Sequence, residues 1–366
     1  MNSAAPERPR YCASGYQMIK SINIRNFRCF EHLKVQECRR INIIVGDNGS
    51  GKTALLEGIF FALGSSPHLG LRFRQQRGLE GAFSAPIRRI EEAIWRDYFY
   101  GGDWQRTISI ELTGDGPEAR SVTLFRGSTQ MSIPLAPDTE ESEPLTSPIC
   151  VVWHDSDGSE HTTFPKFSKS GMEYEGGDED LPDFFLFAAN QTTSSVESAD
   201  RFSSLSRTGK AREFVDILTK EYKWLEDLSI EVIAGAPAIF ATVRGQKDKR
   251  ALANISGGIN RIVAIMLGIA SRPKSVVLVD EIENGLYFKH HTALWRGLLT
   301  LARNYDSQLF LTTHSQEWLN SLVKAAKNDV DDIALWKVES SRKGVVVRQF
   351  SGETLKAGIE YGQEAR

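Results

Sequence analysis

The sequence predicts an α/β fold in which a mostly parallel central sheet carries helices on both faces. Two observations predict it. The run INIIV at 41–45 is apolar throughout, as buried parallel strands are, and it leads directly into a glycine-rich loop and a helical pattern. In the second half of the chain, apolar strand-like runs alternate with amphipathic helical segments, which is the pattern of strands joined by crossover helices.

Length and composition exclude several classes of protein. The chain has 366 residues, of which 41% are hydrophobic and 25% are charged, so wholesale disorder is excluded. The net charge of -3 excludes a basic nucleic-acid coat protein. The longest apolar stretch, 262–270, is about half of the ~20 residues that a membrane-spanning helix needs, and residues 1–17 lack the apolar region of a secretory signal. Because the four cysteines form no CxxC pair, we expect reduced thiols and a cytoplasmic protein with no membrane partner.

The first half is expected to contain a flexible tail, the start of the core and an insert. Residues 1–17 are polar and aperiodic and predict the tail, with Met18 as an alternative start. A first strand begins at 19–24, the buried strand lies at 41–45, and a helix with one apolar face follows at 52–63. Strand-like runs at 107–112, 121–125 and 149–153 predict an antiparallel β subdomain. Residues 138–183 hold 13 acidic residues and 2 lysines, which predicts a solvated acidic insert.

The second half predicts a regular alternation of elements. Helices are expected at 211–224, 256–270, 286–302 and 315–326, and strands at 228–234, 238–243, 275–281 and 308–314. We therefore expect one domain over 18–366. Its core is formed by 18–64 and 183–366, and an arginine-rich, β and acidic segment is inserted at 65–182.

The glycine-rich loop carries the first chemical motif. GDNGSGKT at 46–53 matches the pattern GxxxxGK[ST] in full, between a strand and a helix. Its backbone N–H groups are expected to bind nucleotide phosphates, with Lys52 on the β and γ phosphates and the Thr53 hydroxyl on Mg²⁺. The predicted phosphate-binding residues are Gly46, Asp47, Asn48, Gly49, Ser50, Gly51, Lys52 and Thr53.

Three further motifs follow in chain order. Ser256, Gly257 and Gly258 open a helix whose start can approach a phosphate, and a second copy of the chain could supply it without crowding the first loop. Asp280 and Glu281 end an apolar strand, where the aspartate can hold Mg²⁺ and the glutamate can orient or deprotonate water. His314 follows the next strand and can contact the γ-phosphate. The alternatives are a plain helix cap, two solvated acids and a buried structural histidine.

These motifs, in this order, resemble the ABC-type ATPase heads of the RecF, SMC and Rad50 group. The opening MIKSINIRNFRCFEHLKV…INIIVGDNGSGKT is similar to their first two strands and Walker A motif. SGGINR, LVDEIENGL and LTTHSQEWL are most similar to stand-alone ATPases of the overcoming-lysogenisation-defect (OLD, AAA15) type. The resemblance covers about 18–64 and 183–326.

The resemblance implies a P-loop NTPase fold of the ABC-ATPase type and a role for each matching residue. Lys52, Glu281 and His314 are the catalytic lysine, glutamate and switch histidine, and Asp280 is the Walker B aspartate. Ser256, Gly257 and Gly258 form the signature motif that acts on the partner's ATP, and Asn284 lies in the D-loop at the dimer interface. The third Mg²⁺ ligand, after Thr53 and Asp280, is a Q-loop glutamine, for which Gln191 fits better than Gln105 or Gln130.

The sequence also departs from the family. The signature reads SGGIN rather than LSGGQ, which argues against transport, and Tyr287 stands where relatives usually have histidine. The chain has no long coiled coil, and about 40 residues after the last matching helix leave no room for a Toprim nuclease. The acid pairs Asp155/Asp157 and Asp178/Asp180 are weak alternatives for a metal site because they precede the Walker B strand.

Three functions follow from these observations. The first is an ATP hydrolase that binds ATP and Mg²⁺, forms a head-to-tail homodimer or a higher oligomer, and controls a partner or DNA in phage defence or DNA repair and maintenance. The second is a nucleotide-gated scaffold with little turnover for a separate effector protein such as a nuclease or toxin. The third is direct DNA binding through phosphate contacts of Arg72, Arg74, Arg77, Arg88 and Arg89.

Overall fold

The computed structural model describes residues 18–64, 92, 94–115, 119–127, 149–155, 158–168, 171–175, 184–189, 194–327, 329–342 and 344–364. Several sequence predictions lie outside the described residues. They are the tail at 1–17, the five arginines of 72–89, Gln130, Gln191, Asp157, Asp178 and Asp180, and most of the acidic insert.

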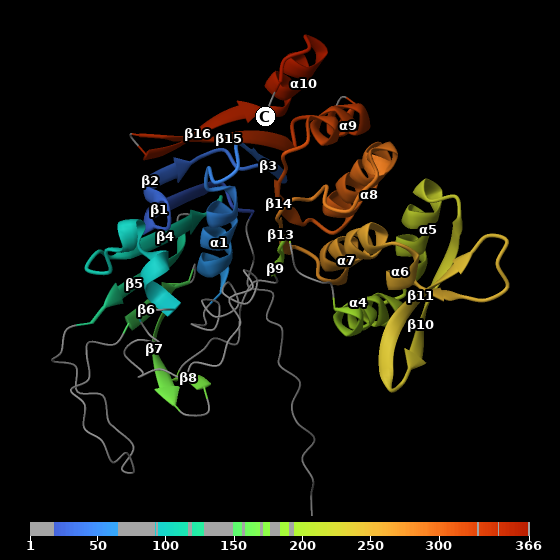
Figure 1. Cartoon of the computed structure of the whole chain (residues 1–366), viewed down its shortest axis with the longest axis horizontal. Coiled ribbons are helices and arrows are strands. Elements are labelled where there is room, and N and C mark those ends of the chain that lie inside the picture. Colours follow the sequence, from blue (N-terminus) through green and yellow to red (C-terminus); the bar gives the residue numbers. More distant parts are fainter. Residues whose placement is uncertain are drawn as a thin grey trace, which may run out of the picture.

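A mixed six-stranded sheet forms the centre of the molecule (Figure 1). Its strand order is β16 (Gly344–Ser351), β15 (Ile333–Ser341), β3 (Ile41–Val45), β14 (Gln308–Thr312), β13 (Val276–Val279) and β9 (Phe184–Phe187). All neighbouring strands pair in parallel except β16, which pairs antiparallel with β15. Every residue of β3, β13 and β14 is buried, because both faces of this sheet are covered. The prediction of a mostly parallel central sheet is confirmed.

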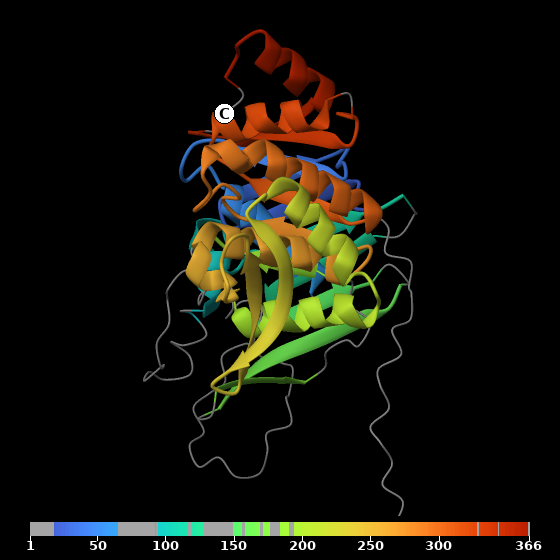
Figure 2. The same cartoon turned by 90° about the vertical axis from the view of Figure 1, so that its right-hand side faces the viewer.

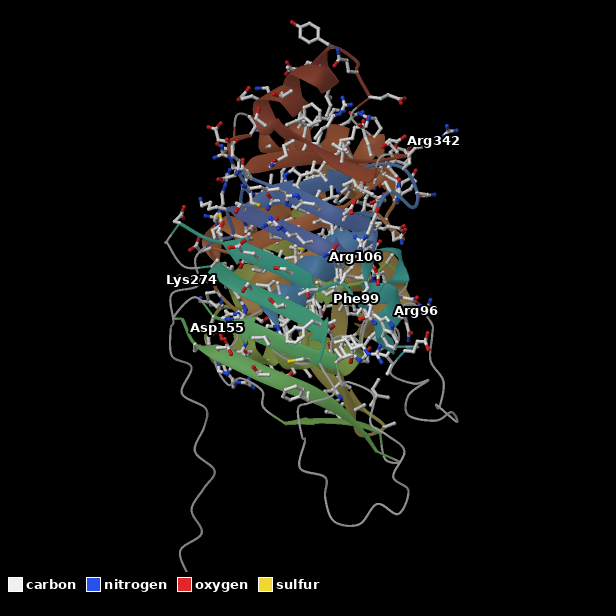
Figure 3. All side chains as sticks on the ribbon, turned by 90° about the vertical axis from the view of Figure 1, so that its left-hand side faces the viewer. Arg96, Phe99, Arg106, Asp155, Lys274 and Arg342 are labelled. Carbon is white, nitrogen blue, oxygen red and sulfur yellow. The ribbon has the colours of Figure 1, made fainter. Side chains whose placement is uncertain are left out.

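A second sheet has seven antiparallel strands. They are ordered β2 (Phe30–Val35), β1 (Ser21–Phe27), β4 (Ile108–Thr113), β5 (Ala119–Arg126), β6 (Ile149–His154), β7 (Glu160–Ser168) and β8 (Gly171–Glu175). β1 lies between β2 and β4. The β strands of the predicted insert therefore extend the amino-terminal hairpin. Buried residues alternate with half-buried ones along β4, because only one face of this sheet covers the core. Figure 3 looks onto the other face.

Helix α1 (Lys52–Leu63) lies between the two sheets (Figure 1). Apart from Thr53, all of its residues are buried, so the expected single apolar face is wrong: the helix packs on both sides. Ile44 of β3 packs toward α1, whereas Ile43 packs toward the helices on the opposite face. This alternation along one strand divides the hydrophobic core into two clusters.

The opposite face of the central sheet is covered by α7 (Gly257–Ser271), α8 (His291–Asn304) and α9 (Gln316–Ala326). Outside them lie α4 (Ser195–Arg207), α5 (Ala211–Glu221), α6 (Leu252–Ile255) and the small sheet of β10 (Leu225–Ile233), β11 (Ala236–Val243) and β12 (Arg250–Ala251) (Figure 2). Helix α10 (Gly352–Glu360) follows β16. Of the helices and strands after residue 183, the sequence did not predict α4, α6, β12, β15, β16 and α10.

The boundaries of two predicted helices were too wide. The helix expected at 211–224 ends at Glu221, because Tyr222–Trp224 turn into β10. The helix expected at 286–302 begins only at His291, after a short 3-10 turn, η3 (Phe288–His290). None of the helices in the described part of the chain is long and apolar enough to cross a membrane.

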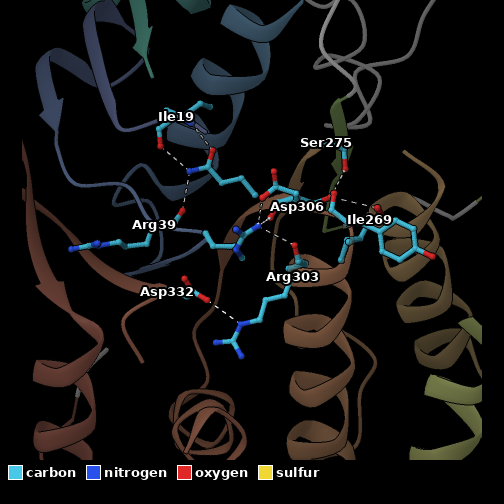
Figure 4. Close-up of polar contacts among 12 residues, drawn as sticks. Ile19, Arg39, Ile269, Ser275, Arg303, Asp306 and Asp332 are labelled. Carbon is cyan, nitrogen blue, oxygen red and sulfur yellow. Dashed lines mark hydrogen bonds and ion pairs between the residues drawn. The ribbon is translucent and has the colours of Figure 1, made fainter. Parts of the chain in front are cut away.

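A polar network closes the end of the central sheet that lies away from the glycine-rich loop (Figure 4). The buried Gln308 side chain accepts from the Ile19 N–H at 3.0 Å and donates to the carbonyls of Ile19 and Arg39 at 2.8 and 2.9 Å. It joins the entry to β1 to the first residue of β14. These residues position strands and take no part in the site described next.

Candidate nucleotide site

The glycine-rich loop begins where β3 ends. A methyl group on Gly46 would lie 2.2 Å from the carbonyl oxygen of Val338, so only glycine allows the loop to pass this close to β15. The Lys52 ammonium donates to the carbonyls of Gly46 and Asp47, each at 2.8 Å. Burial lowers the pKa of Lys52, and the carboxylates of Asp280, Glu281, Asp47 and Glu283 oppose that shift. Lys52 is therefore folded over its own loop, beside several acids.

Asp280 lies at the carboxyl end of β13, and the structure brings it together with Thr53. Its Oδ2 accepts from the Thr53 hydroxyl at 3.0 Å, and its Oδ1 accepts from the Thr312 hydroxyl at 2.6 Å. Hydroxyl and carboxylate oxygens are the ligands that Mg²⁺ prefers. Among the described residues, no three His, Cys, Asp or Glu side chains gather into a metal site. A cation between Thr53 and Asp280 would need phosphate oxygens or water to complete its shell.

Glu281 has a strained backbone and is held from several sides. Its φ of 48° lies in the left-handed region, and its N–H donates to the Thr312 hydroxyl at 2.7 Å. Oε2 accepts from the Asn284 amide at 2.8 Å, and Oε1 lies 3.7 Å from Nε2 of His314. The backbone N–H of His314 donates to Oε1 of Glu283 at 2.7 Å. Glu281, Asn284 and His314 thus form one cluster within a single chain.

A cavity of about 600 Å³ joins these groups. Its lining residues include Asn48, Gly49, Gly51, Lys52 and Thr53 from the loop, and Asp280, Glu281 and His314 from the ends of β13 and β14. The remaining lining residues, Arg28, Cys29, Ala54 and Asp97, were not predicted. Ser256, Gly257 and Gly258 do not line it.

Arg28 is placed by contacts that are distant in the sequence. Its Nε lies 3.2 Å from Oε2 of Glu57, and both side chains are largely buried. Its guanidinium carbon lies 4.0 Å from the centre of the Tyr98 ring, and its backbone N–H donates to the Tyr98 carbonyl at 2.7 Å. The only feature of the sequence that could have indicated Arg28 is its place in the turn after β1, ahead of the glycine-rich loop. Only the fold shows that this turn reaches the cavity.

Arg261 is a second residue that sequence analysis missed. Its guanidinium donates to three backbone carbonyls, those of Asp280 at 2.7 Å, Ala188 at 2.8 Å and Ala189 at 3.1 Å. Burial lowers its pKa, with the nearby acids opposing. Arg261 therefore ties α7 to the end of β13 and to the segment after β9.

The start of α7 lies against the turn that contains Asn284. The Ser256 hydroxyl caps the helix, accepting weakly from the Ile259 N–H at 3.4 Å. Gly258 packs so closely on Gly285 that an added methyl group would lie 1.9 Å from the Gly285 carbonyl oxygen, whereas a methyl group on Gly257 would meet nothing within 4 Å. Gly257 is exposed.

Two alternative site residues lie elsewhere. Asp155, labelled in Figure 3, forms an ion pair with Arg120, and its Oδ2 lies 3.5 Å from Nε2 of His161, so its carboxylate is not free for a metal. Gln105 lies in the turn before β4 and does not line the cavity. Gln191 follows β9, which neighbours β13 as a Q-loop strand would, but it lies outside the described residues.

Comparison with protein families decides the identity of the fold. Residues 21–226, more than half of the chain, match a family described as "AAA domain". The chain belongs to this family, as an ABC-type ATPase related to SMC and RecF heads. Residues 162–320 match a second family, "AAA domain, putative AbiEii toxin, Type IV TA system".

Among curated proteins, an "ATP/GTP phosphatase" of Helicobacter pylori is 23% identical and aligns over 94% of this chain and 98% of its own length. "Structural maintenance of chromosomes protein 6" of Saccharomyces cerevisiae is 32% identical over 39% of this chain and 13% of its length. "DNA replication and repair protein RecF" of Tropheryma whipplei is 45% identical over 14% of each. The predicted resemblance and the predicted enzyme class, ATPase, are confirmed.

A solved SMC head bound to the C-winged helix domain of ScpA has the same fold. It superposes with a TM-score of 0.51 at 15% identity, covering 92% of this chain and 98% of that one. The predicted fold class is confirmed.

Proposed function

We propose that the chain hydrolyses ATP in a Mg²⁺-dependent cycle, in which two copies close head to tail around two nucleotides and reopen after hydrolysis. The observation that carries this proposal is the convergence of Lys52, Thr53, Asp280 and Glu281 on one cavity. A cation, a hydroxyl, a metal-binding carboxylate and a second carboxylate are the groups that phosphoryl transfer to water requires.

Each of these residues has a distinct role in the proposed reaction. Backbone N–H groups of 46–53 and the Lys52 ammonium bind the phosphates and stabilise charge on the transferred group. Thr53, Asp280 and Gln191 would hold Mg²⁺, which neutralises charge on the β and γ phosphate oxygens. Glu281, oriented by Asn284, accepts a proton from the attacking water, and His314 contacts the γ-phosphate.

The dimer follows from the position of the signature motif. Ser256 to Gly258 lie outside the cavity of their own chain, yet Gly257 is exposed and nothing lies within 4 Å of a methyl group placed there. A helix start that is open to a partner can donate N–H groups to the partner's γ-phosphate. We propose that the site is completed in this way by a second copy.

The biological setting is proposed from the family alone. One matching family is described as a putative toxin of a toxin–antitoxin system, and RecF relatives are named for DNA replication and repair. These names support phage defence or DNA maintenance, with control of a partner or DNA as the output. The name of the full-length relative includes both ATP and GTP, which leaves the base preference open. We also propose that residues 18–366 form one ATPase domain.

The test is the solution mass of the Glu281→Gln variant, measured by light scattering with and without Mg·ATP. Removing the base should trap the ATP-bound state, so a monomer should become a dimer only when nucleotide is added. Lys52→Ala is the matched control and should stay monomeric in both conditions. An oligomer whose mass ignores ATP would favour the second function, a nucleotide-gated scaffold for an effector. Turnover of Glu281→Gln at the wild-type rate would show that another residue is the base.

A further inference from the structure

The residues that line the cavity fall into two groups, which we call its phosphate end and its second end. Asp280, Glu281 and His314 line the phosphate end, beside the loop that holds the β and γ phosphates. Besides the loop and the start of α1, the other lining residues are Arg28, Cys29 and Asp97. With the γ-phosphate at Glu281, these three residues are the part of the lining that is left for the ribose and base. The inference drawn here rests on the proposed function, namely that this cavity binds a nucleoside triphosphate.

Arg28 offers a fixed, flat surface at this second end. Its guanidinium is held by Glu57, whose side chain is 4% exposed, and by the face of Tyr98. One of its terminal nitrogens donates to the Asp97 carbonyl at 3.2 Å. Because a guanidinium is planar and delocalised, a heterocyclic ring can stack on it. Arg28 is therefore positioned to support a base.

Asp97 lies beside Arg28 on a short 3-10 turn, η1 (Arg96–Tyr98). Buried Tyr98 and the β-bridge between Phe99 and Phe27 fix this turn on the amino-terminal hairpin; Figure 3 labels Arg96, the first residue of the turn, and Phe99, which follows the turn. Within the described part of the chain, the Asp97 carboxylate forms no ion pair and no side-chain hydrogen bond. It is exposed and can accept hydrogen bonds from a ligand.

We propose that Asp97 reads the base of the bound nucleotide and favours guanine. A carboxylate only accepts hydrogen bonds, and close to phosphates it would repel them, so its place at the far end suits a base edge that carries donors. Guanine presents two adjacent donors on its Watson–Crick edge, N1–H and the N2 amino group, which match the two carboxylate oxygens. Adenine presents one donor there, the N6 amino group, beside the acceptor N1. The site would therefore make one more charge-assisted hydrogen bond to GTP than to ATP.

The test compares kcat/KM for GTP and ATP in the wild-type chain, Asp97→Ala and Asp97→Asn, together with binding of non-hydrolysable analogues of both nucleotides. Asp97→Ala removes two such hydrogen bonds from GTP and one from ATP, so kcat/KM should fall for both nucleotides, and the ratio of kcat/KM for GTP to that for ATP should fall by about tenfold. The asparagine variant should lower the GTP/ATP ratio further than the alanine variant, because its amide oxygen can accept from the N6 amino group of adenine while its NH2 group donates to N1. Asp103→Ala removes an exposed carboxylate of the same segment that does not line the cavity, and should leave the GTP/ATP ratio unchanged.

The outcomes separate this proposal from the proposed function. Equal losses for the two nucleotides in Asp97→Ala, or an unchanged GTP/ATP ratio, would overturn the assignment of Asp97 while leaving the nucleotide site in place. A wild-type chain that binds neither analogue, with Lys52→Ala indistinguishable from it, would overturn both.

Discussion

The contact between Gly258 and Gly285 leads to a prediction with a built-in control. In Gly258→Ala, the new methyl group would lie 1.9 Å from the Gly285 carbonyl oxygen and 2.7 Å from its carbonyl carbon. Ordinary contact begins near 3.4 Å, so backbone must move by more than 1 Å. Overpacking of this kind costs about 1–3 kcal/mol in the free energy of unfolding. The moving turn includes Asn284, which holds Glu281, and a 1 Å displacement of a catalytic group can lower kcat about a hundredfold.

The control is Gly257→Ala, one residue earlier in the same helix. No atom lies within 4 Å of its added methyl group, so its free energy of unfolding should stay within about 0.5 kcal/mol of wild type. Urea unfolding followed by tryptophan fluorescence measures both variants. Equal stability of the two variants, or full ATPase activity in Gly258→Ala, would refute the reasoning that this close approach sets the position of the catalytic turn.

Three further predictions follow from other parts of the molecule. Arg261→Met should lower the free energy of unfolding by about 2–4 kcal/mol, because it removes the guanidinium donor from the buried Asp280 carbonyl and from the part-buried carbonyls of Ala188 and Ala189, and it should lower kcat more than it changes KM. Arg261→Lys should lose less stability, and a Met variant as stable as wild type would contradict this. Burial lowers the pKa of His291 below its usual 6.5, so its contribution to stability is present above pH 6.5 and is lost as pH falls through the folded-state pKa, by at most about 1.4 kcal/mol per pH unit. His291→Phe keeps a ring against Trp318, 4.7 Å away, and should flatten the stability profile between pH 7 and 5.5; parallel profiles would argue against a buried neutral histidine. If the five arginines of 72–89 contact DNA, filter binding should weaken steeply between low and moderate salt, whereas a flat salt dependence or no binding would remove DNA as a direct partner.

The motifs that carry local chemistry could be predicted from the sequence. The loop at 46–53 and the acids at 280–281 each follow an apolar strand. Because parallel strands end at the same edge of a sheet, the local sequence is enough to predict both the strands and the meeting of the loop with the acids at that edge. The cap at Ser256 could be predicted for the same reason, because a serine before an apolar helical run accepts from the backbone N–H three residues later.

The rest depends on contacts between distant segments. Arg28 and Asp97 meet only because η1 packs on the amino-terminal hairpin, and Arg261 reaches Asp280 only through the packing of α7 on β13. The hydrophobic periodicity of the sequence does not indicate contacts between segments that are far apart in the chain. α1 looked amphipathic because its neighbours were unknown, whereas the second sheet covers the side that the pattern assigned to solvent.

The central claim is that one copy's nucleotide is hydrolysed with the help of another copy's signature motif. Mixing two inactive variants tests it most directly. Lys52→Ala removes the phosphate-binding lysine, and Gly257→Asp places a carboxylate at an exposed helix start that has room for it. Each variant alone should be inactive, and Lys52→Ala alone should stay monomeric, but a mixed dimer can hold one ATP in the site that has an intact Lys52 and an intact partner Gly257. When half of the dimers in an equimolar mixture are mixed, one working site in each of them should recover about a quarter of the wild-type ATPase activity. A mixture as inactive as its components, or full activity of Gly257→Asp alone, would contradict completion of the site by a second copy.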